Sequence, residues 1–142
     1  MRRADNDGAS GMVREVVVQR GIVEALRLRG HLLTGKDRAL LEMYLEHGNS
    51  FSQIARLAGV HRKRIARRIR RIVRRLIDDT YPACRGNHID FNGRELAIIK
   101  DYFVHGLPMA RISKGQGVTF YSVRATIRKA RRYAVSRKRG IT

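Results

Sequence analysis

The chain has 142 residues, enough for one compact domain or two very small ones. Its 31 Lys and Arg residues against 12 Asp and Glu residues give a formal net charge of +19, which predicts a polyanionic partner. A hydrophobic content of 43% argues against a disordered chain, and a single cysteine excludes an intrachain disulfide. No apolar run approaches the roughly 20 residues of a membrane span, and no secretory signal is recognisable, so we expect a cytoplasmic protein with no membrane partner.

Residues 1–32 are interpreted as a flexible N-terminal arm followed by a helix. Residues 1–12 are polar and contain glycine, which favours disorder. Within residues 13–32, the run Glu24-Ala25-Leu26-Arg27-Leu28 favours a helix that packs on the unit after it, although Val16-Val17-Val18 is also compatible with a strand.

The rest of the chain contains an internal repeat. At an offset of 58 residues, 34–76 align with 92–134 without a gap, and 11 of the 43 pairs are identical. Apolar positions with helical spacing coincide: Ile65, Ile69, Ile72 and Leu76 match Val123, Ile127, Ala130 and Ala134. The repeat predicts an all-α fold of two tandem three-helix units, 33–77 and 91–135, with a linker over 78–90 and a basic tail over 136–142.

A capping box and a terminal glycine delimit the first helix of each copy. The capping pairs are Thr34 with Asp37 and Asn92 with Glu95. The two helices are expected to end at His47-Gly48 and His105-Gly106. Glycine adopts the left-handed conformation past a helix end at little cost, and histidine suits the negative end of the helix dipole.

A short second helix, a glycine turn and a long basic third helix follow in each copy. The second helices open at Ser50, which has capping-box spacing to Gln53, and at Pro108. They end near Gly59 and Gly117, and the third helices run from about residue 61 to 77 and from about residue 119 to 135. This succession is typical of a helix-turn-helix.

Residues 33–76 resemble region four of bacterial RNA polymerase sigma factors, the domain that recognises the upstream promoter element. The matching residues are Leu33-Thr34, Ser50, Ile54, Gly59-Val60, Arg62, Arg64-Ile65 and Arg74-Arg75-Leu76. Lys63 stands where the family usually has an acidic residue. The resemblance implies a DNA-binding domain whose third helix lies in the major groove, and RNA polymerase as a further candidate partner. We expect a regulator built from sigma-like modules rather than a complete sigma factor.

The third helices carry the candidate nucleic-acid contacts, with base contacts at their N-terminal ends and phosphate contacts further along. The candidate base contacts are His61, Arg62, Lys63 and Arg67 in the first copy and Thr119, Phe120, Tyr121 and Arg124 in the second. The candidate phosphate contacts are Arg64, Arg68, Arg70, Arg71, Arg74, Arg75, Arg128, Lys129 and Arg132. Arginine prefers guanine, whereas aromatic side chains suit thymine methyl groups or sugar edges, so the two copies should prefer different sequences.

Several residues also have simpler interpretations. Phe120 and Tyr121 are equally compatible with core positions, and Tyr44 and Tyr102 are interpreted as core. Cys84 and His88 cannot complete a tetrahedral zinc site and are interpreted as linker residues. We expect no metal and no cofactor. Acidic residues are scattered and no nucleotide-binding glycine loop is present, so we predict no enzymatic activity.

The sequence therefore predicts sequence-specific binding of double-stranded DNA by a nucleoid-associated transcription regulator. Two alternatives stay open, because an arginine-rich helix face also serves as a nonspecific electrostatic grip. One is an RNA-binding or ribosome-associated protein, and the other is an architectural protein that binds DNA of any sequence. The target sequence, the sign of regulation and the oligomeric state stay open as well.

Overall fold

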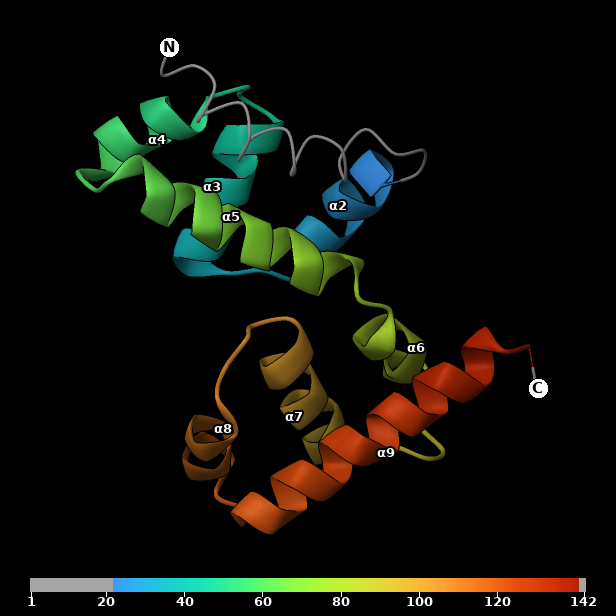
Figure 1. Ribbon diagram of the computed structural model, residues 1–142. Coiled ribbons are helices and arrows are strands. Elements are labelled where there is room, and N and C mark those ends of the chain that lie inside the picture. Colours follow the sequence, from blue (N-terminus) through green and yellow to red (C-terminus); the bar gives the residue numbers. More distant parts are fainter. Residues whose placement is uncertain (1–21, 141–142) are drawn as a thin grey trace. The chain divides into compact units, whose positions relative to one another are not determined.

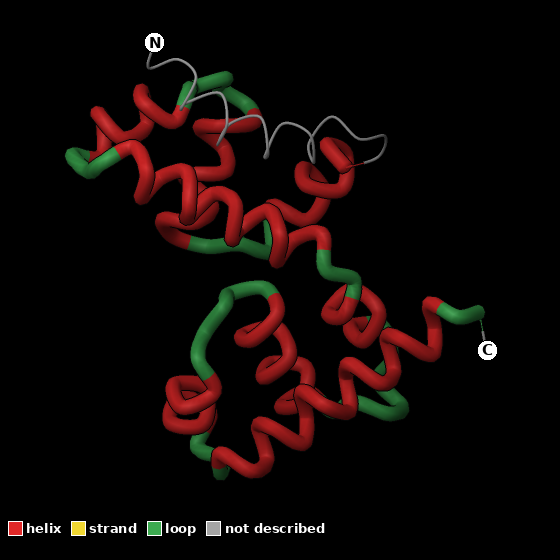
Figure 2. The backbone as a smooth tube through the Cα atoms, viewed as in Figure 1, coloured by secondary structure: helices red, strands yellow, loops and turns green. Residues whose placement is uncertain are grey.

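The structure, a computed structural model, describes residues 22–140, and every regular element in this range is a helix (Figure 1, Figure 2). The predicted all-α fold class is therefore confirmed for this part of the chain. The chain divides between Ile77 and Asp78 into two compact units, called unit 1 and unit 2 below. The predictions for residues 1–21 and for the last two residues of the tail lie outside the described range. None of the helices described is both long and apolar enough to cross a membrane.

Unit 1 is organised around one long helix. It contains α2 (Ile22–Gly30), α3 (Gly35–Leu45), α4 (Phe51–Ala58) and α5 (Arg62–Ile77), and the first three all pack against α5. The helix predicted within residues 13–32 is confirmed over the part that α2 covers, and its Leu26 is fully buried.

Unit 2 is likewise organised around its last helix. It contains α6 (Thr80–Arg85), α7 (Gly93–Phe103), α8 (Met109–Gln116) and α9 (Phe120–Lys138), and α6, α7 and α8 pack against α9. The helix α9 ends three residues later than predicted, so the segment interpreted as a basic tail begins inside it.

The interpretation of residues 78–90 as a linker is wrong, because this segment contains α6 and contributes to the core of unit 2. Pro82 falls in the first turn of α6, where a missing N–H costs no helical hydrogen bond. Thr80 is buried as well, and its backbone N–H donates to the Asp78 carboxylate at 2.8 Å.

Two of the three predicted capping boxes are confirmed. In the Ser50–Gln53 pair, the reciprocal hydrogen bonds measure 3.1 and 2.8 Å. In the Asn92–Glu95 pair, they measure 2.8 and 3.0 Å. The third prediction is wrong: Thr34 occupies the N-cap position of α3, but its side chain makes no capping hydrogen bond.

The helices that open the two repeat copies, α3 and α7, end earlier than predicted. The helices α3 and α7 end at Leu45 and Phe103, two residues before the histidines that were expected to close them. The glycines that follow still have the predicted left-handed backbone, with φ of 66° at Gly48 and 69° at Gly106. They therefore turn the chain after the helix ends rather than terminating the helix themselves.

The turns before α5 and α9 have the same backbone geometry. Gly59 has φ 70° and ψ 32°, and Gly117 has φ 69° and ψ 34°, so both are left-handed. The next residue in each turn, Val60 or Val118, donates its N–H to a carbonyl five residues earlier at 3.1 Å. Only glycine adopts this backbone conformation without strain.

Two glycines of unit 2 should respond oppositely to alanine. Gly117→Ala should lower the free energy of unfolding by about 1–2 kcal/mol, because a Cβ is strained in the left-handed region, even though the space around it is open. Gly115→Ala, inside α8 and in equally open space, should raise it by about 0.5–1 kcal/mol. Urea unfolding followed by circular dichroism measures both, and equal effects would contradict the assigned turn geometry.

Cys84 belongs to the core of unit 2, which corrects its interpretation as a linker residue. Its side chain is fully buried, and its Sγ lies 3.9 Å from the carbonyl oxygen of Ala130 in α9. Burial raises the pKa of the Cys84 thiol to about 11, against a smaller lowering by Arg137 and Lys129.

The raised pKa predicts a loss of stability at alkaline pH. An unfolded cysteine loses its proton near pH 8.5, whereas the folded thiol keeps it up to about pH 11. The contribution is therefore fully present below about pH 8.5 and disappears as pH rises through about 11. Urea unfolding of the wild type and of Cys84→Ala across this range isolates the effect, since lysines and tyrosines titrate in both chains. An equal fall of stability in both would contradict the prediction.

Candidate nucleic-acid interface

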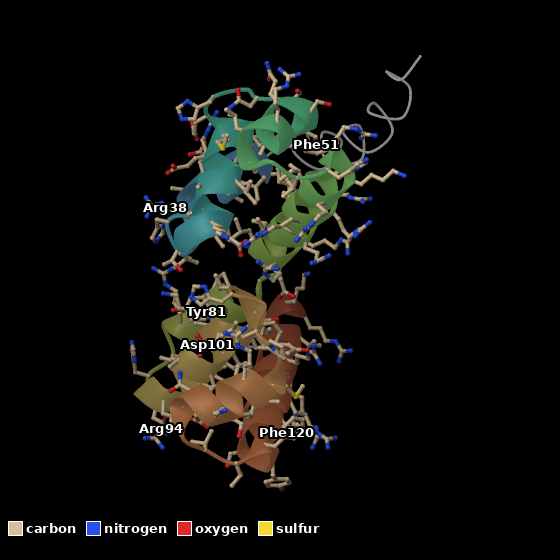
Figure 3. All side chains as sticks on the ribbon, turned by 90° about the vertical axis from the view of Figure 1, so that its left-hand side faces the viewer. Arg38, Phe51, Tyr81, Arg94, Asp101 and Phe120 are labelled. Atoms are coloured by element: carbon tan, nitrogen blue, oxygen red, sulfur yellow. The ribbon has the colours of Figure 1, made fainter. Side chains whose placement is uncertain are left out.

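The helix α5 carries nine Lys and Arg residues among its 16 and no acidic residue. Its buried residues include Ile65, Ile69, Ile72 and Leu76, which lie three or four positions apart and form one stripe against the core. The side of the helix opposite this stripe carries five exposed cations. Figure 3 shows side chains with blue nitrogen tips projecting from the green ribbon of α5. We call the five exposed cations the α5 basic face: Lys63, Arg64, Arg67, Arg71 and Arg74.

Three other residues predicted to contact nucleic acid lie elsewhere on α5 or before it. Arg62 and Arg70 are half-buried at the borders of the apolar stripe, and the Arg70 Nε donates to the Ala66 carbonyl at 3.4 Å. His61 is exposed and precedes the helix, and its Nδ1 accepts the backbone N–H of Lys63 at 3.1 Å. One ring nitrogen of His61 is thus occupied in capping α5.

Asp37 in the first turn of α3 holds two of the predicted phosphate contacts. Its carboxylate pairs with the Nη2 atoms of Arg68 and Arg75, each at 2.9 Å. The pKa of the Arg75 guanidinium is lowered, chiefly because the side chain is partly buried and to a smaller extent because Arg68 and Arg71 are near. The Asp37 carboxylate opposes this lowering but does not cancel it. This pair of bonds fastens α5 to α3 and explains why Asp37 takes no part in a capping box.

The carboxyl end of α5 is also held in place. The Arg29 side chain in α2 donates from Nη1 to the carbonyl of Leu76 at 2.7 Å. Carbonyls in the last turn of a helix have no partner within the helix, so a cationic donor satisfies both the hydrogen bond and the helix dipole. The exposed cations of the α5 basic face therefore project from a helix that is fixed along its length.

The outward side of α9 is chemically mixed. Its buried residues, Val123, Thr126, Ile127 and Ala130, form a stripe against the core of unit 2. Opposite this stripe lie the residues that we call the α9 outer face: Tyr121, Ala125, Arg128 and Arg132. Phe120 and Arg124 lie exposed at its border.

The first turn of α9 is capped by Thr119, whose hydroxyl oxygen accepts the backbone N–H of Ser122 at 3.0 Å. Phe120 is 48% exposed and Tyr121 is 77% exposed, so neither is a core residue. Thr119 itself is exposed. Of the candidate base contacts in unit 2, all four are therefore on the surface.

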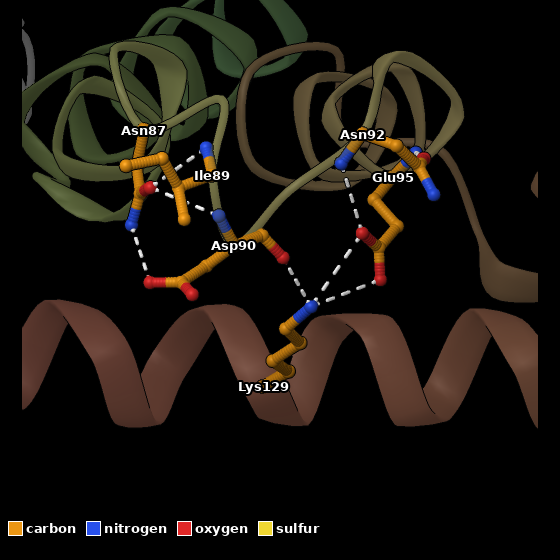
Figure 4. A network of polar contacts seen from close by, with 6 residues as sticks. All are labelled: Asn87, Ile89, Asp90, Asn92, Glu95 and Lys129. Atoms are coloured by element: carbon orange, nitrogen blue, oxygen red, sulfur yellow. Dashed lines mark hydrogen bonds and ion pairs between the residues drawn. The ribbon is translucent and has the colours of Figure 1, made fainter.

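Lys129, by contrast, is bound within unit 2 (Figure 4). Its Nζ donates to the backbone carbonyl of Asp90 and to the Glu95 carboxylate, at 3.2 Å for Oε2, and it lies 4.7 Å from the centre of the Phe91 ring. Figure 4 shows Glu95 serving at the same time as the capping partner of Asn92. Lys129 thus links α7 to α9, and its ammonium group is occupied by contacts within unit 2.

Tyr44 and Tyr102 are half-buried rather than fully enclosed. The Tyr44 ring stacks on the fully buried Phe51 with centroids 5.3 Å apart, and Tyr102 packs edge-on against Phe103 at 5.0 Å. Both tyrosines therefore support the apolar interiors of their units and lie apart from the two outward faces defined above.

Ala125 was not among the predicted contacts. It is half-buried and lies on the α9 outer face one turn after Tyr121. Its repeat equivalent at an offset of 58 is Arg67 on the α5 basic face. The alignment of the two copies already paired Ala125 with a candidate base contact, but alanine has no polar group that would suggest a contact. Its place on the α9 outer face is what makes it a candidate.

Comparisons of the chain with protein-family models, with curated proteins and with solved structures find no match. Among residues 22–140, no three His, Cys, Asp or Glu side chains gather as ligands for a metal ion. The chemistry that the two outward faces offer is cationic in unit 1 and both cationic and aromatic in unit 2.

Neighbouring arginines of α5 should differ in their effect on stability. Arg75→Ala should lower the free energy of unfolding by about 1–2 kcal/mol, because it removes a half-buried partner of Asp37. Arg74→Ala, at an exposed position, should change it by less than about 0.5 kcal/mol. Each variant removes one positive charge, so the difference reports the ion pair. Urea unfolding measures both, and equal losses would contradict the role assigned to Asp37.

Proposed function

We propose that this chain binds double-stranded DNA with sequence preference and thereby regulates transcription. The observation that carries the proposal is the α5 basic face, in which Lys63, Arg64, Arg67, Arg71 and Arg74 are exposed on one side of a fixed helix. A helix with cations along one side suits a major groove, which is wide enough to admit an α-helix between two rows of phosphates.

The proposal assigns a helix-turn-helix to each unit, made of α4 with α5 and of α8 with α9. Three features support this assignment: a short helix, a left-handed glycine at its end, and a longer helix that begins within three residues. The same backbone angles and the same hydrogen bond recur in both turns. The resemblance of residues 33–76 to sigma-factor region four supports the same assignment, and with it RNA polymerase as a candidate second partner.

Charge supplies the first step of the proposed mechanism. The chain carries a formal net charge of +19, and the phosphates of a duplex attract such a chain over a Debye length. Binding that neutralises about 8 phosphates would give a slope of about −7 in a plot of log K against log salt. This capture is independent of base sequence.

Base contacts supply the second step. The first residues of a recognition helix reach base edges, so Lys63 and Arg67 are the cations of the α5 basic face best placed to contact bases. Arginine and lysine donate to the O6 and N7 acceptors of guanine. Arg71 and Arg74, further along the helix, are assigned to phosphates. The proposed activity is binding alone, with no catalytic step and no cofactor.

Two alanine variants one turn apart test the proposal. Arg67→Ala should reduce discrimination at one base pair by about 1–3 kcal/mol and leave binding to random duplexes nearly unchanged. Arg71→Ala should weaken selected and random duplexes alike and reduce the salt slope by about 1. Fluorescence anisotropy over a salt series, with one duplex selected from a random library and one of random sequence, measures both effects.

Identical behaviour of the two variants on both duplexes would contradict base contact by Arg67. In that case an architectural protein that binds any DNA would account better for the α5 basic face. A competition between duplex DNA and hairpin RNA separates the remaining alternative, since an RNA-binding protein would prefer the hairpin, whose groove shape and 2′-hydroxyl groups differ from those of DNA.

A further inference from the structure

The two outward faces differ most at the positions where base contact is expected. Lys63 and Arg67 on the α5 basic face correspond, at the repeat offset of 58, to Tyr121 and Ala125 on the α9 outer face. Two cationic positions in unit 1 are thus an aromatic residue and a methyl group in unit 2. Residues one helical turn apart share a face, so the exposed Tyr121 and the half-buried Ala125 lie in one strip along α9.

The aromatic part of this strip is exposed to solvent. Tyr121 is 77% exposed, and Phe120 at its border is 48% exposed. Large aromatic side chains in contact with water gain free energy when a partner covers them. The capping bond from the Ser122 N–H to the Thr119 hydroxyl stabilises the first turn of α9, the turn that carries both aromatic residues.

Cations lie beside the strip and indicate the chemistry of the partner that covers it. Arg124, Arg128 and Arg132 are all exposed along the same side of α9, and no acidic residue lies within this helix. A partner that places negative charge around a central apolar group fits this arrangement. Duplex DNA does so where a thymine exposes its 5-methyl group in the major groove between two phosphate backbones.

We propose that unit 2 recognises thymine in duplex DNA through its 5-methyl group, with Tyr121 and Ala125 as the contacting residues and Phe120 at the edge of the contact. The inference rests on the proposed function and adds the base chemistry of the second unit. Unit 1 and unit 2 then select chemically different half-sites, the first containing guanine and the second containing thymine.

Replacement of thymine by uracil provides a direct test, because uracil keeps the base pair and the O4 acceptor and lacks only the methyl group. The full chain is titrated with a duplex selected from a random library and with copies in which thymines of one half-site at a time are replaced by uracil. We expect each contacted methyl group to account for about a fourfold change in Kd. Uracil in the half-site of unit 1 should have no effect.

Two variants at equivalent positions assign the effect to its residue. Tyr121→Ala should reduce the difference in Kd between the thymine and uracil duplexes. Tyr121 is exposed, so the fold should be retained, which circular dichroism checks. Lys63→Ala, the matched change in unit 1, should keep the full uracil effect. The variants also identify the half-sites, since each should relax selection in only one of them.

The outcomes separate this inference from the proposed function. Equal binding of thymine and uracil duplexes by the wild type, or an undiminished uracil effect in Tyr121→Ala, would overturn the inference while sequence preference itself remained. A wild-type chain that selects no sequence from the library, or that prefers hairpin RNA, would overturn the proposed function and this inference together.

Discussion

The crowding of positive charge on α5 is the physical constraint on which unit 1 depends. Nine cations in one helix place like charges three and four residues apart, a spacing that destabilises an isolated helix. Burial of the stripe that contains Ile65, Ile69 and Leu76 offsets this repulsion. Asp37 and Arg29 then hold the helix at its side and at its carboxyl end. The cations left on the outside are fixed in place, and their mutual repulsion is relieved further by any polyanion.

In unit 2 the last helix is less crowded with positive charge, and a different ion pair fastens it. The repeat equivalents of Arg68 and Arg75 are Thr126 and Tyr133, which carry no positive charge. The first-turn acid of α7, Glu95, pairs with Lys129 instead. An acid in the first turn of one helix and a cation on the last helix thus link the same two elements in both copies, although the cationic partner has moved along the helix. Both copies therefore join these two helices by an ion pair, although the cationic residue of the pair is at a different position.

Local patterns predicted from the sequence were confirmed where the interaction itself is local. The Ser50–Gln53 and Asn92–Glu95 boxes close within four residues, and so the spacing alone is sufficient. The predicted capping box of Thr34 and Asp37 does not form, because Asp37 pairs instead with Arg68 and Arg75, more than thirty positions along the chain. The helix α6 was missed for a similar reason: the burial of Cys84 depends on α9, far along the chain.

The sequence predicts which residue types the two outward faces contain, but not which individual residues of each helix are exposed. A sequence shows that α5 is rich in arginine, but Arg74 and Arg75 are the same residue type, and only the packing of α5 on α3 separates the exposed one from the one paired with Asp37.

The difference between the two faces bears on the kind of DNA target that the proposed function requires. A dimer of identical helix-turn-helix chains presents the same face twice and therefore matches a palindromic site. Here one chain carries two faces that differ at Lys63 and Arg67 against Tyr121 and Ala125. Both outward helices carry exposed arginines, so both units can contribute phosphate contacts, and the difference lies at the positions where base contact is expected. On the proposed function, a non-palindromic target therefore follows from the divergence of the two copies.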